Sequence, residues 1–264
     1  MICADRNSFS ISGSSLPLSL ETSACEVFCD LDGPLVDVSH RYYKTYCLAI
    51  SETVEHYLRE GKVLSVRPMH RDRFWHLKLE RIPDVDIAQM TGFSGDEIDF
   101  FLRTVRDLVN QPHLLKEDRI QPWAIGALER LVARGIRLSL VTLRSHDQAV
   151  QVLKRFGLYH YFDVVQGSTD EFAAYDNYAN VKTVMLSRLI NHQADQLKGA
   201  WMIGDTEADI QSAKAVGVQS IAVSCGMRSQ AYLQRLEPSY VVQNLEFAVD
   251  VVLNNFEKVL AQAT

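Results

Sequence analysis

The segment EVFCDLDGPLVDVS, Glu26–Ser39, joins an apolar strand to a pair of carboxylates. Its first half has the character of a buried strand, and Asp30 and Asp32 come where that strand should end, just before a Gly-Pro turn. Carboxylates two residues apart at a strand end point to roughly the same side. They repel each other unless a positive charge lies between them. The segment therefore predicts a metal site at the end of a buried strand.

Length and composition are those of an ordinary globular protein. The chain has 264 residues, of which 47% are hydrophobic and 23% charged, enough for one large domain or two smaller ones. A net charge of -6 argues against a nucleic-acid partner, which normally meets a broad basic surface. The five cysteines have neither disulfide-scaffold nor zinc-site spacing, so we expect reduced thiols and a cytoplasmic protein.

The N-terminal residues 1–24 are rich in serine and lack the pattern of a signal peptide, because their short apolar patch is broken by Pro17. We expect them to form a loose tail. No run of about eighteen apolar residues follows, so no membrane-spanning helix and no membrane partner are expected. The expected assembly is a monomer or a homodimer.

From Glu26 onward, predicted strands alternate with predicted helices. After the first strand, the expected strands are residues 137–143 (RLSLVTL), 161–167 (YFDVVQG), 199–205 (GAWMIGD), 218–226 (VQSIAVSCG) and 239–242 (SYVV). Helical patterns lie between them, and a last helix begins at Leu245. Such alternation predicts the α/β class, a doubly wound parallel sheet of Rossmann-like type. Sheets of this type bind ligands beyond the carboxyl ends of their strands.

The alternation stops between residues 37 and 118. Three segments in this range have helical spacing: 43–61 (YKTYCLAISETVEHYLREG), 71–82 (RDRFWHLKLERI) and 95–110 (GDEIDFFLRTVRDLVN). We expect an all-helical cap domain over 37–118. It would be inserted into an α/β core domain made of 25–36 and 119–264.

Reactive side chains stand at the predicted carboxyl ends of three strands and at the start of one helix. Besides Asp30 and Asp32, they are Thr142, Lys182, Asp205 and Asp209. Four carboxylates in one pocket require a cation, and oxygen ligands without a suitable His or Cys favour Mg²⁺. A metal, a lysine and a hydroxyl around a carboxylate make a phosphoryl-transfer site, in which the carboxylate attacks phosphorus.

These motifs occur in a familiar order. DLDG (30–33), VT (141–142), Lys182 and GDTEAD (204–209) resemble the four motifs of the haloacid dehalogenase (HAD) superfamily. A helical insertion after the first motif is similar to its phosphoglycolate phosphatase-like branch with a helical cap. The resemblance extends over nearly the whole chain from Glu26. It implies a Mg²⁺-dependent phosphatase, a hydrolase that cleaves a small phosphorylated metabolite through an aspartyl-phosphate intermediate.

The resemblance also implies a role for each motif residue. Asp30 would be the catalytic nucleophile, and Asp32 would protonate the leaving alkoxide and then activate water. The phosphate would be bound by Thr142, Lys182 and Gly33. The Mg²⁺ ligands would be Asp30, Asp32 through its backbone carbonyl, Asp205 and Asp209.

Two positions depart from the usual family pattern. The family has Thr after its first motif, whereas this chain has Pro34, which lacks the hydroxyl and the N–H and predicts a lower turnover. The branch usually shows Lys-Pro in its third motif, whereas Lys182 is followed by Thr183. The lysine assignment therefore rests on its place at a helix start, where the dipole disfavours a cation unless an anion is near.

Other functions remain open at this level. A phosphomutase or phosphotransferase would use the same scaffold, and a weakly active or non-catalytic phosphate-binding protein would be consistent with Pro34. A dehalogenase is disfavoured because the dehalogenases of this branch lack a carboxylate at the position of Asp32. Taken singly, Asp30 and Asp32 could be turn residues and Asp205 a helix N-cap.

Three features near the expected cap have simpler interpretations. His40 and Arg41 follow the first motif and should lie near the cleft mouth, where substrate contact is one hypothesis for them. The basic segment 67–81 is interpreted as the solvated face of an amphipathic helix. Three aromatic residues are expected in the cap core: Trp75, Phe100 and Phe101.

Overall fold

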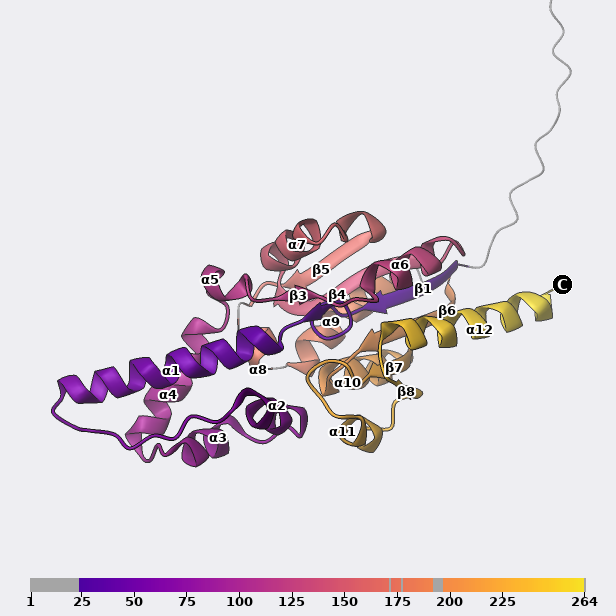
Figure 1. Ribbon diagram of the computed structural model, residues 1–264. Coiled ribbons are helices and arrows are strands. Elements are labelled where there is room, and N and C mark those ends of the chain that lie inside the picture. The colour runs from indigo at the N-terminus through magenta and orange to yellow at the C-terminus, as the bar shows by residue number, and fades with distance from the viewer. Residues whose placement is uncertain (1–23, 171, 177, 192–196, 264) are drawn as a thin grey trace, which may run out of the picture.

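The computed structural model describes residues 24–170, 172–176, 178–191 and 197–263 (Figure 1). The expected tail therefore lies outside the described residues except for Ala24, which begins the first strand. Six parallel strands form the main sheet, in the order β5-β4-β1-β6-β7-β8. Their bounds are β1 Ala24–Cys29, β4 Arg137–Ser145, β5 Val164–Ser168, β6 Leu197–Gly204, β7 Gln219–Val223 and β8 Tyr240–Val242.

Helices cover both faces of this sheet. The central strand β1 is therefore buried on both sides. Val27 and Cys29 pack on one face with three helices: α6 (Ala124–Val132), α7 (His146–Arg155) and α12 (Leu245–Ala263). Phe28 points to the other face, where α9 (Ala179–Asn191) and α10 (Glu207–Val216) pack. The alternation along β1 is that of any strand. The expected doubly wound α/β fold is confirmed.

Short elements complete the described part of this core. They are a 3₁₀ turn at Tyr159–Tyr161, α8 (Ala173–Asp176) and α11 (Gln230–Arg235). Helix α10 ends at Gly217, which has a φ of 74°. This left-handed conformation closes helices readily at glycine because it has no Cβ.

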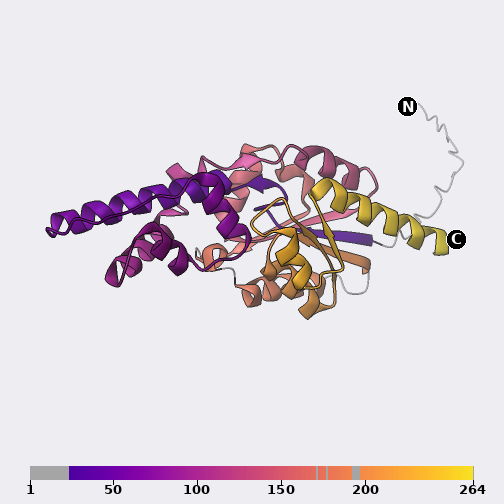
Figure 2. The same ribbon diagram turned by 60° about the horizontal axis from the view of Figure 1, so that its bottom comes forward.

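Residues 38–118 form a mainly helical segment that extends away from the sheet (Figures 1 and 2). Its helices are α1 (Ser39–Arg59), α2 (Arg71–Leu79), α3 (Asp84–Thr91), α4 (Asp96–Leu108) and α5 (Pro112–Leu115). Their interior is aromatic. Tyr46 stacks on Phe74 with ring centroids 4.7 Å apart and meets the edge of Phe101 at 6.1 Å. Phe101 therefore lies in the cap core as expected.

The other two aromatic residues differ. Trp75 is half-buried and packs edge-on against Tyr42, whereas Phe100 is half-exposed and stacks on His56. Both still contact cap side chains. They are peripheral members of the cap's aromatic cluster.

A second, two-stranded sheet joins the cap helices to the core. β2 (Val36–Asp37) and β3 (Arg119–Ile120) pair antiparallel, with Val36 opposite Ile120 and Asp37 opposite Arg119. The sequence did not predict this sheet, because two-residue strands leave no periodicity. It holds the outgoing and the returning chain side by side, and so fixes where the cap joins the sheet.

Among the described residues, no helix has the length and apolarity that crossing a bilayer would require.

Candidate active site

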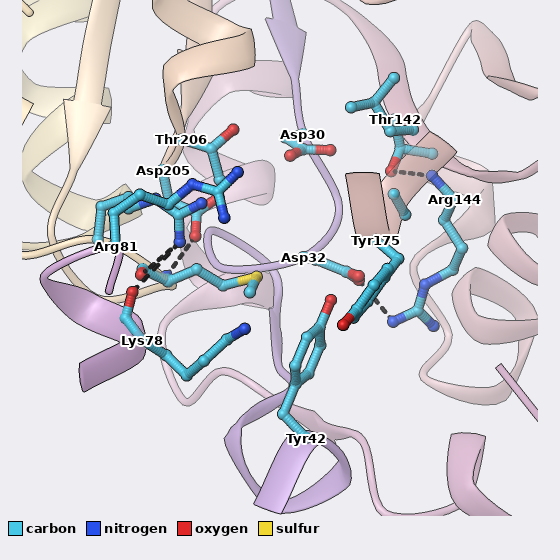
Figure 3. Close-up of a pocket in the computed structure, with 14 residues that line it drawn as sticks. Asp30, Asp32, Tyr42, Lys78, Arg81, Thr142, Arg144, Tyr175, Asp205 and Thr206 are labelled. Atoms are coloured by element: carbon cyan, nitrogen blue, oxygen red, sulfur yellow. Dashed lines mark hydrogen bonds and ion pairs between the residues drawn. The ribbon is translucent and has the colours of Figure 1, made fainter. Parts of the chain in front are cut away.

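Three strand ends bring the sequence-predicted residues together. β1 lies between β4 and β6, and the N–H of Asp30 donates to the carbonyl of Ile203 at 2.9 Å. The carboxylates that follow β1 and β6 thus meet Thr142 of β4 around one pocket. Figure 3 shows Asp30, Asp32, Thr142 and Asp205 around this pocket, with Tyr42 and Lys78 of the cap facing them.

Three carboxylates meet at the pocket, of which Asp30 and Asp205 line it and Asp209 does not. Asp30, Asp205 and Asp209 are buried, and each offers a carboxylate oxygen within 4.8 Å of the other two. Burial raises the pKa of Asp30 to about 7, with Lys182 opposing the shift and Asp209 and Asp32 adding to it. Burial likewise raises the pKa of Asp205 well above its ordinary value, helped by the charges of Asp209 and Asp30. The cluster therefore lacks positive charge.

Lys182 supplies part of that charge. Its Nζ lies 3.0 Å from Oδ2 of Asp30 and also contacts Oδ1 of Asp209. Burial alone would lower the pKa of this lysine, but the carboxylates of Asp209 and Asp30 outweigh burial and raise it. One buried ammonium thus lies between two carboxylates, as the sequence pattern suggested for a lysine at the start of α9.

Asp209 also organises the start of α10. Its Oδ2 accepts hydrogen bonds from the N–H of Thr206 at 3.0 Å and from the Thr206 hydroxyl at 2.8 Å. Thr206, not Asp205, is the N-cap of this helix, so the capping interpretation of Asp205 is wrong. The Asp205 carboxylate does not cap the helix. Its Oδ2 accepts a hydrogen bond from the N–H of Met227 at 2.5 Å.

Two glycines make room for Asp205. A Cβ on Gly33 would lie 2.3 Å from Cγ of Asp205, and a Cβ on Gly226 would lie 1.9 Å from its Oδ2. Gly33 also has a φ of 92°, which other residues rarely adopt. Oδ1 of Asp205 is buried without a hydrogen-bond partner among the described residues. Three buried carboxylates, one lysine and an unpaired oxygen fit a hard divalent cation such as Mg²⁺.

Two side chains hold the turn at Gly33 and Pro34 in place through hydrogen bonds. The side-chain amide of Gln121 donates to the Gly33 carbonyl at 2.9 Å, and the indole N–H of Trp123 donates to the Pro34 carbonyl at 3.1 Å. Both donors follow β3. The turn therefore keeps its position although Pro34 has no N–H to contribute.

Thr142 lies at the pocket but not at the last residue of its strand. β4 continues to Ser145, with irregular pairing to β5 between Val141 and Ser145. The Thr142 hydroxyl accepts from the N–H of Arg144 at 3.3 Å. The side chain is thus oriented within an irregular strand end, beside the pocket that it lines.

Asp32 has different surroundings from the acidic cluster. Its side chain points toward Arg144 in Figure 3, and Oδ1 lies 2.6 Å from Nη2 of that arginine. Oδ2 accepts from Nη2 of Arg41 at 3.2 Å. The binding of Mg²⁺ by the backbone carbonyl of Asp32 stays a prediction. Arg41, expected near the cleft mouth, is instead buried behind Asp32, whereas His40 contacts Arg71 and does not line the pocket.

The cap wall of the pocket contains residues that the sequence interpretation missed. Lys78 lies in the basic segment 67–81 but is buried, with Nζ 2.7 Å from Oδ1 of Asp84. The hydroxyl of Tyr175 donates to the other oxygen of Asp84 at 2.7 Å. The solvated-face interpretation is therefore wrong for Lys78. Its spacing of four residues from the buried Phe74 was the available signal.

A second cap contact closes the pocket from the other side. Glu207 accepts from Nε of Arg81 at 2.8 Å and from Nε of Arg228 at 2.8 Å. The N–H of Ser229 donates to the Leu79 carbonyl at 3.0 Å. The end of α2 is thus tied to the loop after β7 and to the start of α10. The sequence carried no signal for this contact, which joins three distant segments.

Residues 27–223 match the sequence profile of the family described as haloacid dehalogenase-like hydrolase. The chain belongs to this family. The resemblance to the HAD superfamily is confirmed, and the matched range includes the helical insertion and the sheet strands except β8.

Curated HAD relatives are similar over most of their length. The pyrophosphatase PpaX of Halalkalibacterium halodurans is 25% identical over 232 residues, which cover 86% of this chain and 95% of that protein. The phosphoglycolate phosphatase of Mesorhizobium japonicum is 25% identical over 219 residues, covering 82% and 89%. The similarity to the phosphoglycolate phosphatase-like branch is thereby supported.

Solved structures of the HAD family show the same fold. A haloacid dehalogenase-like hydrolase from Streptococcus pneumoniae superposes with a TM-score of 0.57 at 25% identity, over 88% of this chain and 99% of that one. A HAD-superfamily hydrolase from Geobacter sulfurreducens superposes with a TM-score of 0.58 at 20% identity, over 87% and 96%. At 20% identity, the likeness to the Geobacter sulfurreducens protein shows a shared fold and nothing more.

Proposed function

We propose that this protein is a Mg²⁺-dependent phosphomonoester hydrolase that acts through an aspartyl-phosphate on a small organic phosphate. The observation that carries the proposal is the convergence of Asp30, Asp205 and Asp209 with Lys182 in one buried cluster. Membership of a hydrolase family and the phosphatase names of its relatives support it. A site of this kind suits a phosphate group because metal and lysine both stabilise charge on phosphoryl oxygens.

In the first half-reaction, a carboxylate oxygen of Asp30 attacks phosphorus while the bond from phosphorus to the ester oxygen breaks. Asp32 donates its proton to the departing alkoxide. Thr142, Lys182 and the backbone around Gly33 hold the other phosphate oxygens. Asp30, Asp32 and Thr142 all line the pocket, which supports these roles.

In the second half-reaction, Asp32 accepts a proton from water as the water oxygen bonds to phosphorus. The bond from phosphorus to the Asp30 oxygen breaks, which releases inorganic phosphate and restores the Asp30 carboxylate. The ammonium of Lys182, 3.0 Å from Asp30, offsets the charge that returns to this carboxylate. A bound Mg²⁺ would stabilise charge on the phosphoryl oxygens, held by Asp30, Asp205, the Asp32 carbonyl and Asp209.

The helical segment 37–118 acts as a cap domain on a core of residues 25–36 and 119–264. Lys78 and Arg81 of this cap line the pocket, so they select the group that leaves. Cap opening admits substrate, and closure excludes water during the first half-reaction. The four cysteines among the described residues are free thiols, which fits work in the reducing cytoplasm.

The test is release of inorganic phosphate from 4-nitrophenyl phosphate in the presence of Mg²⁺. The wild-type protein should release phosphate, and both chelation of the metal and Asp30→Asn should abolish the release. A substrate panel should include pyrophosphate and 2-phosphoglycolate, the compounds in the names of its relatives. Equal background from wild type and Asp30→Asn would favour a non-catalytic phosphate-binding protein.

A phosphomutase is the rival reaction on the same scaffold. It would return the phosphoryl group of Asp30 to a sugar phosphate rather than to water. Incubation with a sugar phosphate separates the two reactions, because a hydrolase releases free phosphate in proportion to turnover. An isomerised sugar phosphate without free phosphate would replace the proposed hydrolysis by phosphoryl return.

A further inference from the structure

Four charged side chains close into a ring of alternating sign behind the pocket. Arg144 Nη2 lies 2.6 Å from Oδ1 of Asp32 and 2.8 Å from Oδ2 of Asp118. Arg41 donates from Nε to Oδ1 of Asp118 at 2.8 Å and from Nη2 to Oδ2 of Asp32 at 3.2 Å. Each arginine therefore bridges the same two carboxylates, and the ring as a whole is neutral.

The ring is buried except on its pocket side. The side chains of Arg41, Arg144 and Asp118 are 2%, 1% and 0% exposed, whereas that of Asp32 is 15% exposed. Asp32 and Arg144 line the pocket, and Asp118 does not. Asp118 therefore has no direct path to a substrate. Its contacts are the two arginines that in turn hold Asp32.

The four members come from four separate places in the chain. Arg41 lies in the first turn of α1, just after β2, and Asp118 comes just before β3. Asp32 follows β1, and Arg144 is near the end of β4. Since β2 and β3 pair, the ring lies where both connections to the cap leave the core. Nη1 of Arg41 also donates to the carbonyl of Val109 and to Oδ1 of Asn110, which fixes the arginine further.

Such a ring is a device for orientation more than for stability. Buried ion pairs lose most of their Coulomb energy to desolvation, so their net contribution to folding is small. Burial alone would lower the pKa of Arg144, but Asp32 and Asp118 outweigh burial and raise it, so the guanidinium stays charged. Arg41 donates a hydrogen bond to one oxygen of Asp32, and Arg144 forms an ion pair with the other oxygen without hydrogen-bond geometry. A cation against each oxygen restricts rotation of the carboxylate.

We infer that Arg41, Arg144 and Asp118 are positioning residues, which orient the Asp32 carboxylate toward the water of the second half-reaction. The inference rests on the proposed function. In that step Asp32 accepts one proton from water while the water oxygen bonds to phosphorus and the bond to Asp30 breaks. A misoriented Asp32 slows this step. Attack of Asp30 on an activated aryl phosphate is spared, because 4-nitrophenolate leaves without protonation.

The experiment is pre-steady-state turnover of 4-nitrophenyl phosphate by full-length Arg144→Lys and Asp118→Asn with Mg²⁺. We expect a burst of 4-nitrophenol near one equivalent per active site, followed by a steady state about tenfold or more slower than wild type. kcat and KM should fall together, which leaves kcat/KM within about threefold of the wild-type value. Asp30→Asn should give no burst.

Glu26→Gln is the matched control for loss of a buried, ion-paired carboxylate. Glu26 is 1% exposed, accepts from the Ser139 hydroxyl at 2.6 Å and pairs with Arg137 at 3.1 Å. It lies in β1, on the strand that leads to Asp30, but is not part of the ring. This variant should melt at a lower temperature than wild type but keep the wild-type burst amplitude and steady-state rate. Melting curves of all variants separate loss of fold from loss of orientation.

Each outcome decides the inference. Folded ring variants with kcat and kcat/KM reduced in equal proportion and no burst would overturn it, as would unchanged or faster turnover. If Asp118→Asn does not fold, Arg41→Lys, which keeps a cation against Asp118, carries the same test beside Arg144→Lys. A wild-type protein that releases no 4-nitrophenol would instead refute the proposed function, and this inference with it.

Discussion

The Nζ of Lys182 lies 3.0 Å from Oδ2 of Asp30, which joins the start of α9 to the end of β1 inside the protein. The same ammonium contacts Asp209, so one cation compensates two buried carboxylates. Burial raises the pKa of Asp30 to about 7, and Lys182 is the largest opposing influence. The pKa of Asp30 thus depends on a residue far away in sequence.

Replacing Lys182 by Met should therefore leave Asp30 and Asp209 uncompensated. We expect kcat to fall about a hundredfold or more, since a donor to the charged oxygens is lost. The metal-free variant should melt at a lower temperature than wild type, and Mg²⁺ should raise its melting temperature by more than it raises that of wild type. Kinetics and thermal melting with and without Mg²⁺ measure both effects.

The control is Lys154→Met, which removes an exposed lysine of α7. It should leave kcat and the effect of Mg²⁺ unchanged. A Lys182→Met variant with wild-type kcat would show that this lysine only neutralises the cluster and takes no part in turnover.

Metal binding should stabilise the folded protein. Mg²⁺ at a hundred times its Kd adds about 2.7 kcal/mol to the free energy of unfolding, because the unfolded chain lacks the site. Asp205→Asn removes the charge of a proposed ligand, whose Oδ1 is without a hydrogen-bond partner among the described residues, so it should abolish most of that gain. Calorimetric melting of both proteins over a Mg²⁺ series is the measurement. Equal gains in the two proteins would place the metal elsewhere.

Glu207 should hold the cap against the core. Glu207→Gln weakens its ion pairs with Arg81 and Arg228, which lie at 2.8 Å each. We expect faster hydrogen exchange at the Ser229 amide and along α2, whose last residue Leu79 accepts from that amide. Hydrogen exchange with peptide mass spectrometry reads both segments.

Arg134→Ala provides the comparison for this cap contact, because it breaks an exposed ion pair with Glu257. Exchange along α2 should not change in this variant. If Glu207→Gln also leaves α2 unchanged, the backbone contact from Ser229 to Leu79 suffices to hold the cap.

Gly33 should tolerate no side chain. Gly33→Ala places a Cβ 2.3 Å from Cγ of Asp205 and imposes a φ of 92° on an alanine, so we expect a loss of about 1–3 kcal/mol in the free energy of unfolding. Mg²⁺-dependent activity should be lost as well, because Asp205 must move. Gly126→Ala in α6 has open space around its Cβ and should instead stabilise by about 0.5–1 kcal/mol. Denaturant unfolding compares the two, and similar values would refute the crowding at Gly33.

The sequence predicted the residues at the strand ends because parallel strands place their carboxyl ends at one edge. Asp30, Thr142 and Asp205 each follow or end an apolar run, so a doubly wound sheet was enough to bring them together. The strand order, with β1 between β4 and β6, could not be predicted from the local sequence pattern. It was set by how the two faces of the sheet are packed.

The sequence could not predict the partners of these residues. Long stretches of chain separate Arg41, Asp118 and Arg144. The sequence alone does not distinguish a buried arginine from a solvated one. The charged neighbours of Lys78 favour a solvated side chain, whereas its spacing of four residues from the buried Phe74 indicates a buried one. Charged groups buried by pairing are recognised only once the pair is seen.

Acid-quenched turnover followed by peptide mass spectrometry tests the central claim most directly. Wild-type protein mixed with Mg²⁺ and a rapidly reacting aryl phosphate should yield one peptide heavier by a phosphoryl group, with the added mass located on Asp30. The Asp30→Asn variant should yield no modified peptide and release no phosphate. Phosphate release by wild type with the phosphoryl group on another residue, or undiminished release by Asp30→Asn, would contradict the account.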